Sequence, residues 1–261
     1  MGIIGELRKA LIARHKSGVV FTHVPKCGGT SVQTALFRHF RLSREHILPV
    51  ESRAAERLGA PHLRQAAAFP EFEALELRKQ LVAYALSRDV KCITGHNPIN
   101  EPIMSAHKGT HKFVTVLRDP VERFCSHYRF VYKSGVATAV DEKLDDFLET
   151  NRARWFGSIY VTYFGGAPAA KPVIEQSSIE RAQKIVSGFD AVGFLDRMDK
   201  FQQQLRDLLG VNVKIDVKNR TKDRATHWRG EISDQQLERI REICRPNIEV
   251  YEYARKRCLS A

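Results

Sequence analysis

The sequence predicts an α/β fold, a three-layer sandwich in which a central parallel sheet lies between two layers of helices. Short apolar runs alternate with segments of helical periodicity along most of the 261 residues, as in strands that are joined by helical crossovers. No internal repeat, low-complexity tract or linker breaks this alternation. Residues 1–261 are therefore expected to form a single domain around one large core.

Four short β-rich runs are the predicted strands. They are residues 19–24, 90–94, 112–117 and 190–196. Because helical segments separate them, the strands are expected to pair in parallel and to be covered on both faces. The helices are expected at residues 30–40, 71–89, 120–132, 141–150 and 177–189, and in a segment that ends at Gly210. Residues 41–70 have a mixed composition and are expected to form a loop with a short helix.

Two capping-box patterns mark predicted helix starts, Ser177-x-x-Glu180 and Ser233-x-x-Gln236. The second pattern places C-terminal helices from about residue 233. Residues 1–16 predict an amphipathic helix, because they are charged throughout and have too little apolar length to span a bilayer.

The chain is basic, with 42 Lys and Arg residues against 30 Asp and Glu residues and a net charge of +12. Such a charge suggests an anionic partner: a nucleotide, an acidic polysaccharide, nucleic acid or a membrane surface. The basic residues form no dense run. A basic surface without a specific partner is therefore an equally open interpretation.

The cysteines indicate a reducing compartment. They are Cys27, Cys92, Cys125, Cys244 and Cys258. Their odd number and the absence of a CxxC spacing predict free thiols, with neither a disulfide framework nor a zinc site. With no predicted membrane span, these features favour a bacterial cytoplasmic enzyme or an excised catalytic domain.

The segment VVFTHVPKCGGTS, residues 19–31, has the layout of a phosphate-binding loop. Its two glycines let the backbone approach a phosphate, and the first N–H groups of the next helix add partial positive charge. Lys26 adds a full charge, and two hydroxyl groups add donors. The lysine precedes the glycines, so the loop does not match the GxxxxGK[ST] pattern of ATPases and GTPases. A plain glycine-rich turn, with Cys27 as a small residue in it, is the simpler alternative.

A second anion site is predicted after the third strand. Arg118 directly follows that strand beside a helix start, where its guanidinium can bind a phosphate with two donors. Ser126 lies about two helical turns further on and returns to the same face. Asp119 and Glu122 are interpreted as cap and first-turn residues. Two such sites predict a ligand with two phosphate groups.

The pair HVPKCGGTS and VLRDPVERFCSHY resembles the two nucleotide signatures of sulfotransferases that use 3′-phosphoadenosine 5′-phosphosulfate (PAPS). The resemblance is greatest to the carbohydrate branch, which includes heparan sulfate 2-O-sulfotransferase. The layout of strands and helices extends it over most of the chain, and it implies the sulfotransferase fold, which is similar to that of P-loop nucleotide kinases. Cys27 departs from the threonine that related loops often have.

The resemblance also implies roles for individual residues. Lys26 would contact the 5′-phosphate and the oxygen that bridges to sulfur, stabilising charge on the leaving group. Arg118 and Ser126 would hold the 3′-phosphate. The other implied cofactor contacts are Cys27, Gly28, Gly29, Thr30 and Ser31 in the loop, and Asn219, Arg220, Thr221 and Lys222 in the polar segment before the C-terminal helices. No metal is implied.

His96 is the predicted general base. Sulfuryl transfer to a hydroxyl needs a base for the proton, and a histidine with a near-neutral pKa suits that role. Gly95-His96 follows the second predicted strand, at the sheet edge where the donor is expected, and the carbohydrate branch has a similar Gly-His pair. His23 is the reserve candidate, with packing as its simpler role.

The acceptor is less defined by the sequence. A basic cleft suits an acidic polysaccharide, while a lipid-linked or small glycoside acceptor remains open. The segment 151–166 is rich in aromatic residues, which either stack on sugar rings or form a core helix. The candidates are Trp155, Phe156, Tyr160 and Tyr163.

Two other classes of protein compete with this interpretation. A nucleotide or small-molecule kinase would use a related loop, but it ordinarily needs a Walker loop and a magnesium-binding carboxylate, and neither is evident. A nucleic-acid binder would explain the net charge, yet it leaves the two phosphate sites without a purpose. We therefore expect no nucleic-acid partner.

Overall fold

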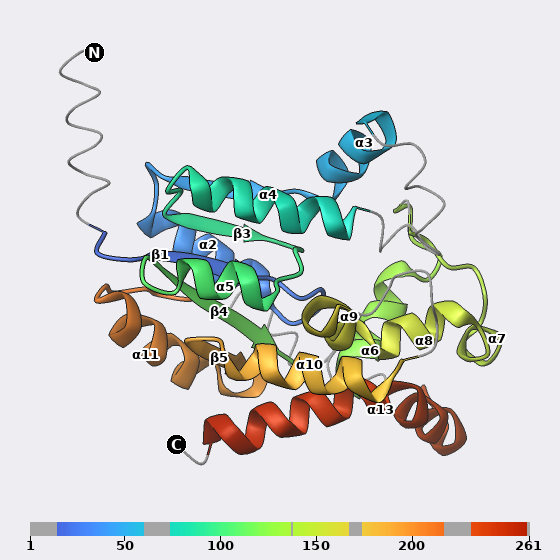
Figure 1. Ribbon diagram of the computed structural model, residues 1–261. Coiled ribbons are helices and arrows are strands. Elements are labelled where there is room, and N and C mark those ends of the chain that lie inside the picture. Colours follow the sequence, from blue (N-terminus) through green and yellow to red (C-terminus); the bar gives the residue numbers. More distant parts are fainter. Residues whose placement is uncertain (1–14, 60–73, 137, 167–173, 217–230, 260–261) are drawn as a thin grey trace.

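The computed structural model describes residues 15–59, 74–136, 138–166, 174–216 and 231–259. Within them, five strands form one sheet in the order β2-β3-β1-β4-β5, and every pair is parallel. Helices lie on both sides of the sheet (Figure 1). The predicted α/β fold with a central parallel sheet is confirmed.

Each predicted strand is present, and one further strand was missed. The strands are β1 (Gly18–Thr22), β2 (Arg44–Ile47), β3 (Cys92–Gly95), β4 (His111–Leu117) and β5 (Ala191–Phe194). The missed strand, β2, lies in the segment that was expected to be a loop with a short helix. Its only buried residue is Ile47, so it has no apolar run, and its strand conformation depends on pairing with β3 at the edge of the sheet.

The helices follow the predicted order closely. They are α2 (Gly29–His39), α3 (Pro49–Gly59), α4 (Leu75–Ser87), α5 (Glu101–His107), α6 (Pro120–Val131), α7 (Leu144–Leu148), α8 (Asn151–Gly157), α9 (Ile159–Gly165), α10 (Gln176–Ser187), the 3-10 turn η3 (Leu195–Arg197), α11 (Met198–Leu209) and α13 (Asp234–Leu259). Gly210 ends α11 in the left-handed conformation, with φ of 64°, as predicted. None of the described helices has both the length and the apolar character needed to cross a bilayer.

One predicted capping box is confirmed and one is wrong. The Ser233 hydroxyl accepts from the Gln236 N–H at 3.2 Å, and the Gln236 side chain accepts from the Ser233 N–H at 3.0 Å. A single long helix, α13, follows where several helices were expected. Helix α10 instead begins at Gln176, before Ser177, because Glu175 is its cap residue. Residues 1–14 of the predicted N-terminal helix lie outside the described residues.

Alternation along the strands divides the core between the two faces of the sheet. One face packs against α2 and α11, with Val19, Phe21, Val114 and Phe201 among its buried residues. The other face packs against α4, α5, α9, α10 and the C-terminal half of α13. A third cluster joins α6, α7, α8 and the N-terminal half of α13, at the side of the molecule toward which the β4 arrow points in Figure 1.

The close contact of α8 with α13 yields a test of this packing. A Cβ on Gly157 would fall on the backbone oxygen of Ile243. We expect Gly157→Ala to lower the free energy of unfolding by about 1–3 kcal/mol, the usual cost of overpacking. Gly109→Ala is the control, because nothing lies within 4 Å of its added Cβ; its effect should stay within about 0.5 kcal/mol. Urea denaturation measures the free energy of unfolding of both variants, and equal values for the two variants would contradict this packing.

Candidate functional site

Parallel pairing brings three separate segments to one edge of the sheet. Thr22 at the end of β1 lies opposite Gly95 of β3 on one side and Thr115 of β4 on the other. The loop that starts at Lys26, the His96 segment and Arg118 follow these three strand ends. All three therefore emerge at the carboxyl edge, where ligands bind in sheets of this kind.

The loop after β1 has the backbone of an anion site. Lys26 and Gly28 both adopt the left-handed conformation, with φ of 67° and 77°. Helix α2 then begins at Gly29 with no side-chain cap and no acidic residue in its first turn, so side chains do not compete for its first N–H groups. A Cβ on Gly29 would collide with the ring of His23, so only glycine fits there.

The Lys26 side chain lies among positive charges. Its ammonium nitrogen is 3.9 Å from the ring centroid of Phe130, on the last turn of α6. Burial, followed by repulsion from Arg118 and Arg123, lowers the pKa of Lys26. An anion bound here would relieve that repulsion.

Arg118 lies just before α6, and Ser126 lies on that helix. The Arg118 guanidinium is 3.5 Å from a Glu122 carboxylate oxygen and donates to the Lys26 carbonyl at 3.5 Å. Ser126 is one turn beyond Glu122 on the same face and is partly exposed. The Asp119 side chain accepts from the Glu122 N–H at 3.0 Å and caps the helix, which confirms its predicted role.

A buried guanidinium and a tyrosine hydroxyl support the two anion sites, and sequence reasoning found the role of neither. Arg123 is fully buried, donates to the Phe156 carbonyl, and has no partner for its Nε. The Tyr160 hydroxyl accepts from the Arg118 N–H at 3.0 Å and lies 3.6 Å from the Cys27 sulfur. Arg123 lies on a different face of α6 from Glu122 and Ser126, so no local pattern marked it.

Burial also settles the chemistry of Cys27. It raises the pKa of the thiol, an effect that the nearby Arg123 only partly offsets. Cys27 is therefore a packed thiol beside Tyr160 and is not suited to act as a nucleophile. All five cysteines have free thiols.

The His96 ring is oriented by a hydrogen bond from its Nδ1 to the His23 carbonyl, at 2.6 Å. Because a carbonyl only accepts, Nδ1 must be the protonated nitrogen, which leaves Nε2 with a free lone pair. Burial lowers the pKa of His96 to about 4, so the ring is neutral at physiological pH. This arrangement suits a proton acceptor.

The backbone around His96 is anchored on both sides. Its carbonyl accepts from Arg78 at 3.3 Å and from the Tyr163 hydroxyl at 3.4 Å. Arg78 is buried and also donates to the Ser52 hydroxyl at 2.8 Å. A Cβ on Gly95 would lie 2.6 Å from the Ile47 carbonyl oxygen. These contacts fix where the His96 ring emerges from the sheet.

His23 is placed differently. It is buried, and the centroid of its ring lies 4.4 Å from the centroid of the His96 ring. The His23 ring also packs against Gly29. Burial, together with repulsion from His96, lowers its pKa well below the usual range. His23 thus packs beneath the loop, as the simpler interpretation of the sequence had it.

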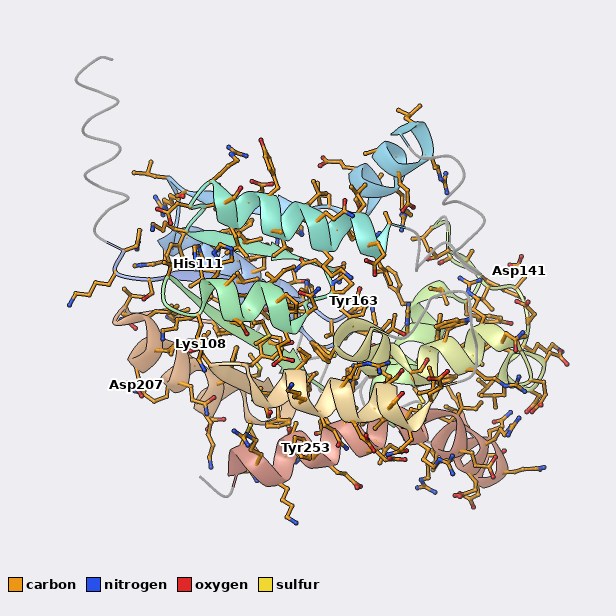
Figure 2. The ribbon with its side chains drawn as sticks, viewed as in Figure 1. Lys108, His111, Asp141, Tyr163, Asp207 and Tyr253 are labelled. Carbon is orange, nitrogen blue, oxygen red and sulfur yellow. The ribbon has the colours of Figure 1, made fainter. Side chains whose placement is uncertain are left out.

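The aromatic segment 151–166 is core. The four candidate side chains, among them Tyr163 of α9 (Figure 2), are at most 2% exposed. The idea that they stack on sugar rings is therefore wrong, because their ring faces are covered by other side chains. Asn219, Arg220, Thr221 and Lys222 lie outside the described residues, so their predicted cofactor contacts remain predictions.

The donor set fits a nucleotide with two phosphate groups. An uncapped helix N-terminus, Lys26 and Arg118 lie at one sheet edge. The buried Arg123, whose Nε has no hydrogen-bond partner, is near enough for its charge to lower the pKa of Lys26. The described residues contain no group of three or more His, Cys, Asp or Glu side chains that could hold a metal ion. The cationic groups and the helix N-terminus are suited to bind phosphate oxygens, and the neutral His96 ring is suited to accept a proton.

The family of the chain is indicated by comparison with known proteins. Residues 9–254 match the model of a family described as the sulfotransferase family. This match covers both predicted nucleotide motifs and every described strand. No curated protein matches the sequence.

The buried neutral histidines predict a pH-dependent stability. His23, His96 and His127 have lowered pKa values in the folded chain, with burial as the main cause. Below pH 6.5 the unfolded chain binds protons that these rings do not, so the free energy of unfolding should fall as the pH falls. Each group contributes up to about 1.4 kcal/mol per pH unit. Urea titrations between pH 7 and 5 test this, and an unchanged stability would contradict it.

Proposed function

Because this chain belongs to the sulfotransferase family, we propose that it transfers a sulfuryl group from PAPS to an acceptor hydroxyl. Adenosine 3′,5′-bisphosphate is the second product. The acceptor is proposed to be a carbohydrate, which includes acidic polysaccharides, and the chain to act as one catalytic domain. The cytoplasmic location stays a prediction from the sequence.

The observation that best supports this proposal is the grouping of Lys26, Arg118 and Arg123 behind one helix N-terminus. Arg123 has no carboxylate partner among the described residues, and Arg118 has Glu122 at 3.5 Å. Partial or full burial of three positive charges raises the free energy of the folded chain unless an anion neutralises them. A ligand with a phosphate at each end of this group meets that requirement.

The protein groups have separate roles in the proposed reaction. The loop from Lys26 to Ser31 binds the 5′-phosphate, and Arg118 with Ser126 binds the 3′-phosphate. The acceptor oxygen attacks sulfur as the bond from sulfur to the phosphate oxygen breaks, and the acceptor proton passes to Nε2 of His96. Lys26 offsets the negative charge that develops on the departing phosphate oxygen.

His96 is suited to this role by its tautomer more than by its basicity. The bond from Nδ1 to the His23 carbonyl keeps Nε2 unprotonated in the resting enzyme. When Nε2 takes the proton, the same carbonyl stabilises the imidazolium that forms. Tyr163 and Arg78 act as positioning residues, because both bind the His96 carbonyl and not the ring.

The two anion sites predict a specific pattern of ligand affinity. By calorimetry, adenosine 3′,5′-bisphosphate should bind without magnesium and more tightly than AMP. Arg118→Ala should weaken bisphosphate binding by about 10–100-fold, since it removes a charged hydrogen-bonding group, and should leave AMP binding nearly unchanged. Equal losses for both ligands would contradict the 3′-phosphate site.

The same titration tests the competing kinase function. Preference for ATP with magnesium would show that the loop serves a kinase and that the sulfotransferase proposal is wrong. Lys26→Ala should lower turnover more than bisphosphate affinity, because its charge acts mainly on the departing group.

Removal of His96 should separate chemistry from binding. His96→Ala is expected to lower turnover by at least about 100-fold and to leave the bisphosphate affinity within about twofold of wild type. The wild-type kcat/KM should fall only as the pH approaches about 4, the pKa of this ring, whereas an ordinary histidine would give a fall near pH 6.5. Near wild-type turnover in the variant would rule out His96 as the base.

A further inference from the structure

The exposed aromatic side chains are the remaining candidates for acceptor contacts, since segment 151–166 is buried. The large aromatic residues with exposed side chains in the described residues are Tyr84, Phe130 and Tyr253. Tyr253 lies on α13 (Figure 2), and Tyr84 lies on α4 beside Arg88. Phe130 alone among these three contacts a residue of the anion sites.

Phe130 lies on the face of α6 that borders the anion sites. Glu122, Ser126 and Phe130 follow one another at intervals of four and so share one face of the helix. Arg118 precedes the helix, and its Nε lies 3.5 Å from a Glu122 carboxylate oxygen. The Phe130 ring is 52% exposed, although the Lys26 ammonium covers one of its faces at 3.9 Å. The ring therefore lies beside Lys26, the residue that is proposed to stabilise the departing phosphate.

The Lys26 ammonium cannot contact the Phe130 ring and a bound phosphate at the same time. Lys26 must move to the 5′-phosphate to act in the proposed reaction, and this movement uncovers the face of Phe130. His96 lies against the same loop, because its Nδ1 donates to the carbonyl of His23, three residues before Lys26, at 2.6 Å. The uncovered ring thus lies beside the loop that carries Lys26 and contacts the proposed base, and the acceptor hydroxyl has to lie near both groups.

We propose that Phe130 is an acceptor-contact residue, whose ring face holds the Lys26 ammonium in the free enzyme and a sugar ring of the acceptor after the donor has bound. This inference rests on the proposed sulfotransferase function and gives the aromatic contact that segment 151–166 does not supply. It also sets an order of binding, because the acceptor site is covered until Lys26 leaves the ring. The donor binds first and the acceptor second.

Binding of the bisphosphate tests the exchange without any acceptor. Phe130→Ala removes the contact that competes for Lys26, so the bisphosphate should bind about two- to fivefold more tightly than to wild type, the equivalent of a contact of about 0.5–1 kcal/mol. Tyr84→Ala is the matched control, an exposed ring with Arg88 over it at 5.4 Å, and it should change nothing. A merely structural role of Phe130 would predict weaker binding in the first variant.

Magnetic resonance gives a second readout of the same exchange. With the lysines labelled by reductive ¹³C-methylation, the Lys26 signal should be shifted by the Phe130 ring and should lose this shift on addition of bisphosphate. Phe130→Leu should abolish the shift in the free protein. A Lys26 signal that keeps its ring-current shift in the bisphosphate complex would overturn the exchange.

The acceptor contact is tested with unsulfated saccharides: cellobiose, lactose, chitobiose and a heparosan tetrasaccharide. By ligand-observed magnetic resonance, at least one should bind to the complex with bisphosphate and only weakly to the free enzyme. Phe130→Ala should weaken that binding by about five- to tenfold, and Phe130→Trp should retain it. Binding that ignores the Phe130 variants or the bisphosphate, or no saccharide binding at all, would overturn the proposal.

These outcomes separate the two proposals. If adenosine 3′,5′-bisphosphate does not bind to the wild-type enzyme, the proposed function fails and the role of Phe130 fails with it. If the bisphosphate binds and only the Phe130 results are negative, the sulfotransferase site stands and the acceptor contact lies elsewhere.

Discussion

The parallel pairing of β1 between β3 and β4 is the constraint on which the site depends. Thr22 sits opposite both Gly95 and Thr115, so the segments after the three strands leave the sheet side by side. A shift of one residue in either pairing would move every side chain of the strand to the opposite face. The buried runs on both faces prevent this, because each strand has apolar partners in two separate clusters. The core thereby fixes the distances between groups that are far apart in sequence.

At this edge of the sheet, the site needs both positive charge and a neutral histidine. Lys26, Arg118 and Arg123 concentrate positive charge and attract an anion, while His96 has to stay neutral to accept a proton. Burial and the neighbouring cations both keep the histidine neutral, and its bond to the His23 carbonyl offsets them only in part. Burial is the main cause, and of the three cations that attract the donor only Lys26 contributes to keeping His96 neutral.

Much of the fold could be predicted from the sequence because strands buried on both faces leave continuous apolar runs. The four predicted strands have this signal, and the glycine-rich loop marks the start of α2. Strand β2 has none, since three of its four residues are partly or fully exposed and only pairing with β3 makes it a strand. The short helix α5, which follows the Asn100 cap, was missed for a similar reason, because seven residues give too few turns for a periodic pattern.

The sequence by itself determined the order of the elements, the two anion motifs and their place at strand ends, because these depend on local spacing and alternation. Only the tertiary structure decided which side chains meet. It placed Arg123 and Tyr160 behind the loop, buried the aromatic segment that had been an acceptor candidate, and left Phe130 exposed beside Lys26. Such contacts join residues more than thirty positions apart, and whether a ring is covered or open depends on helices packing from distant parts of the chain, which no local pattern records.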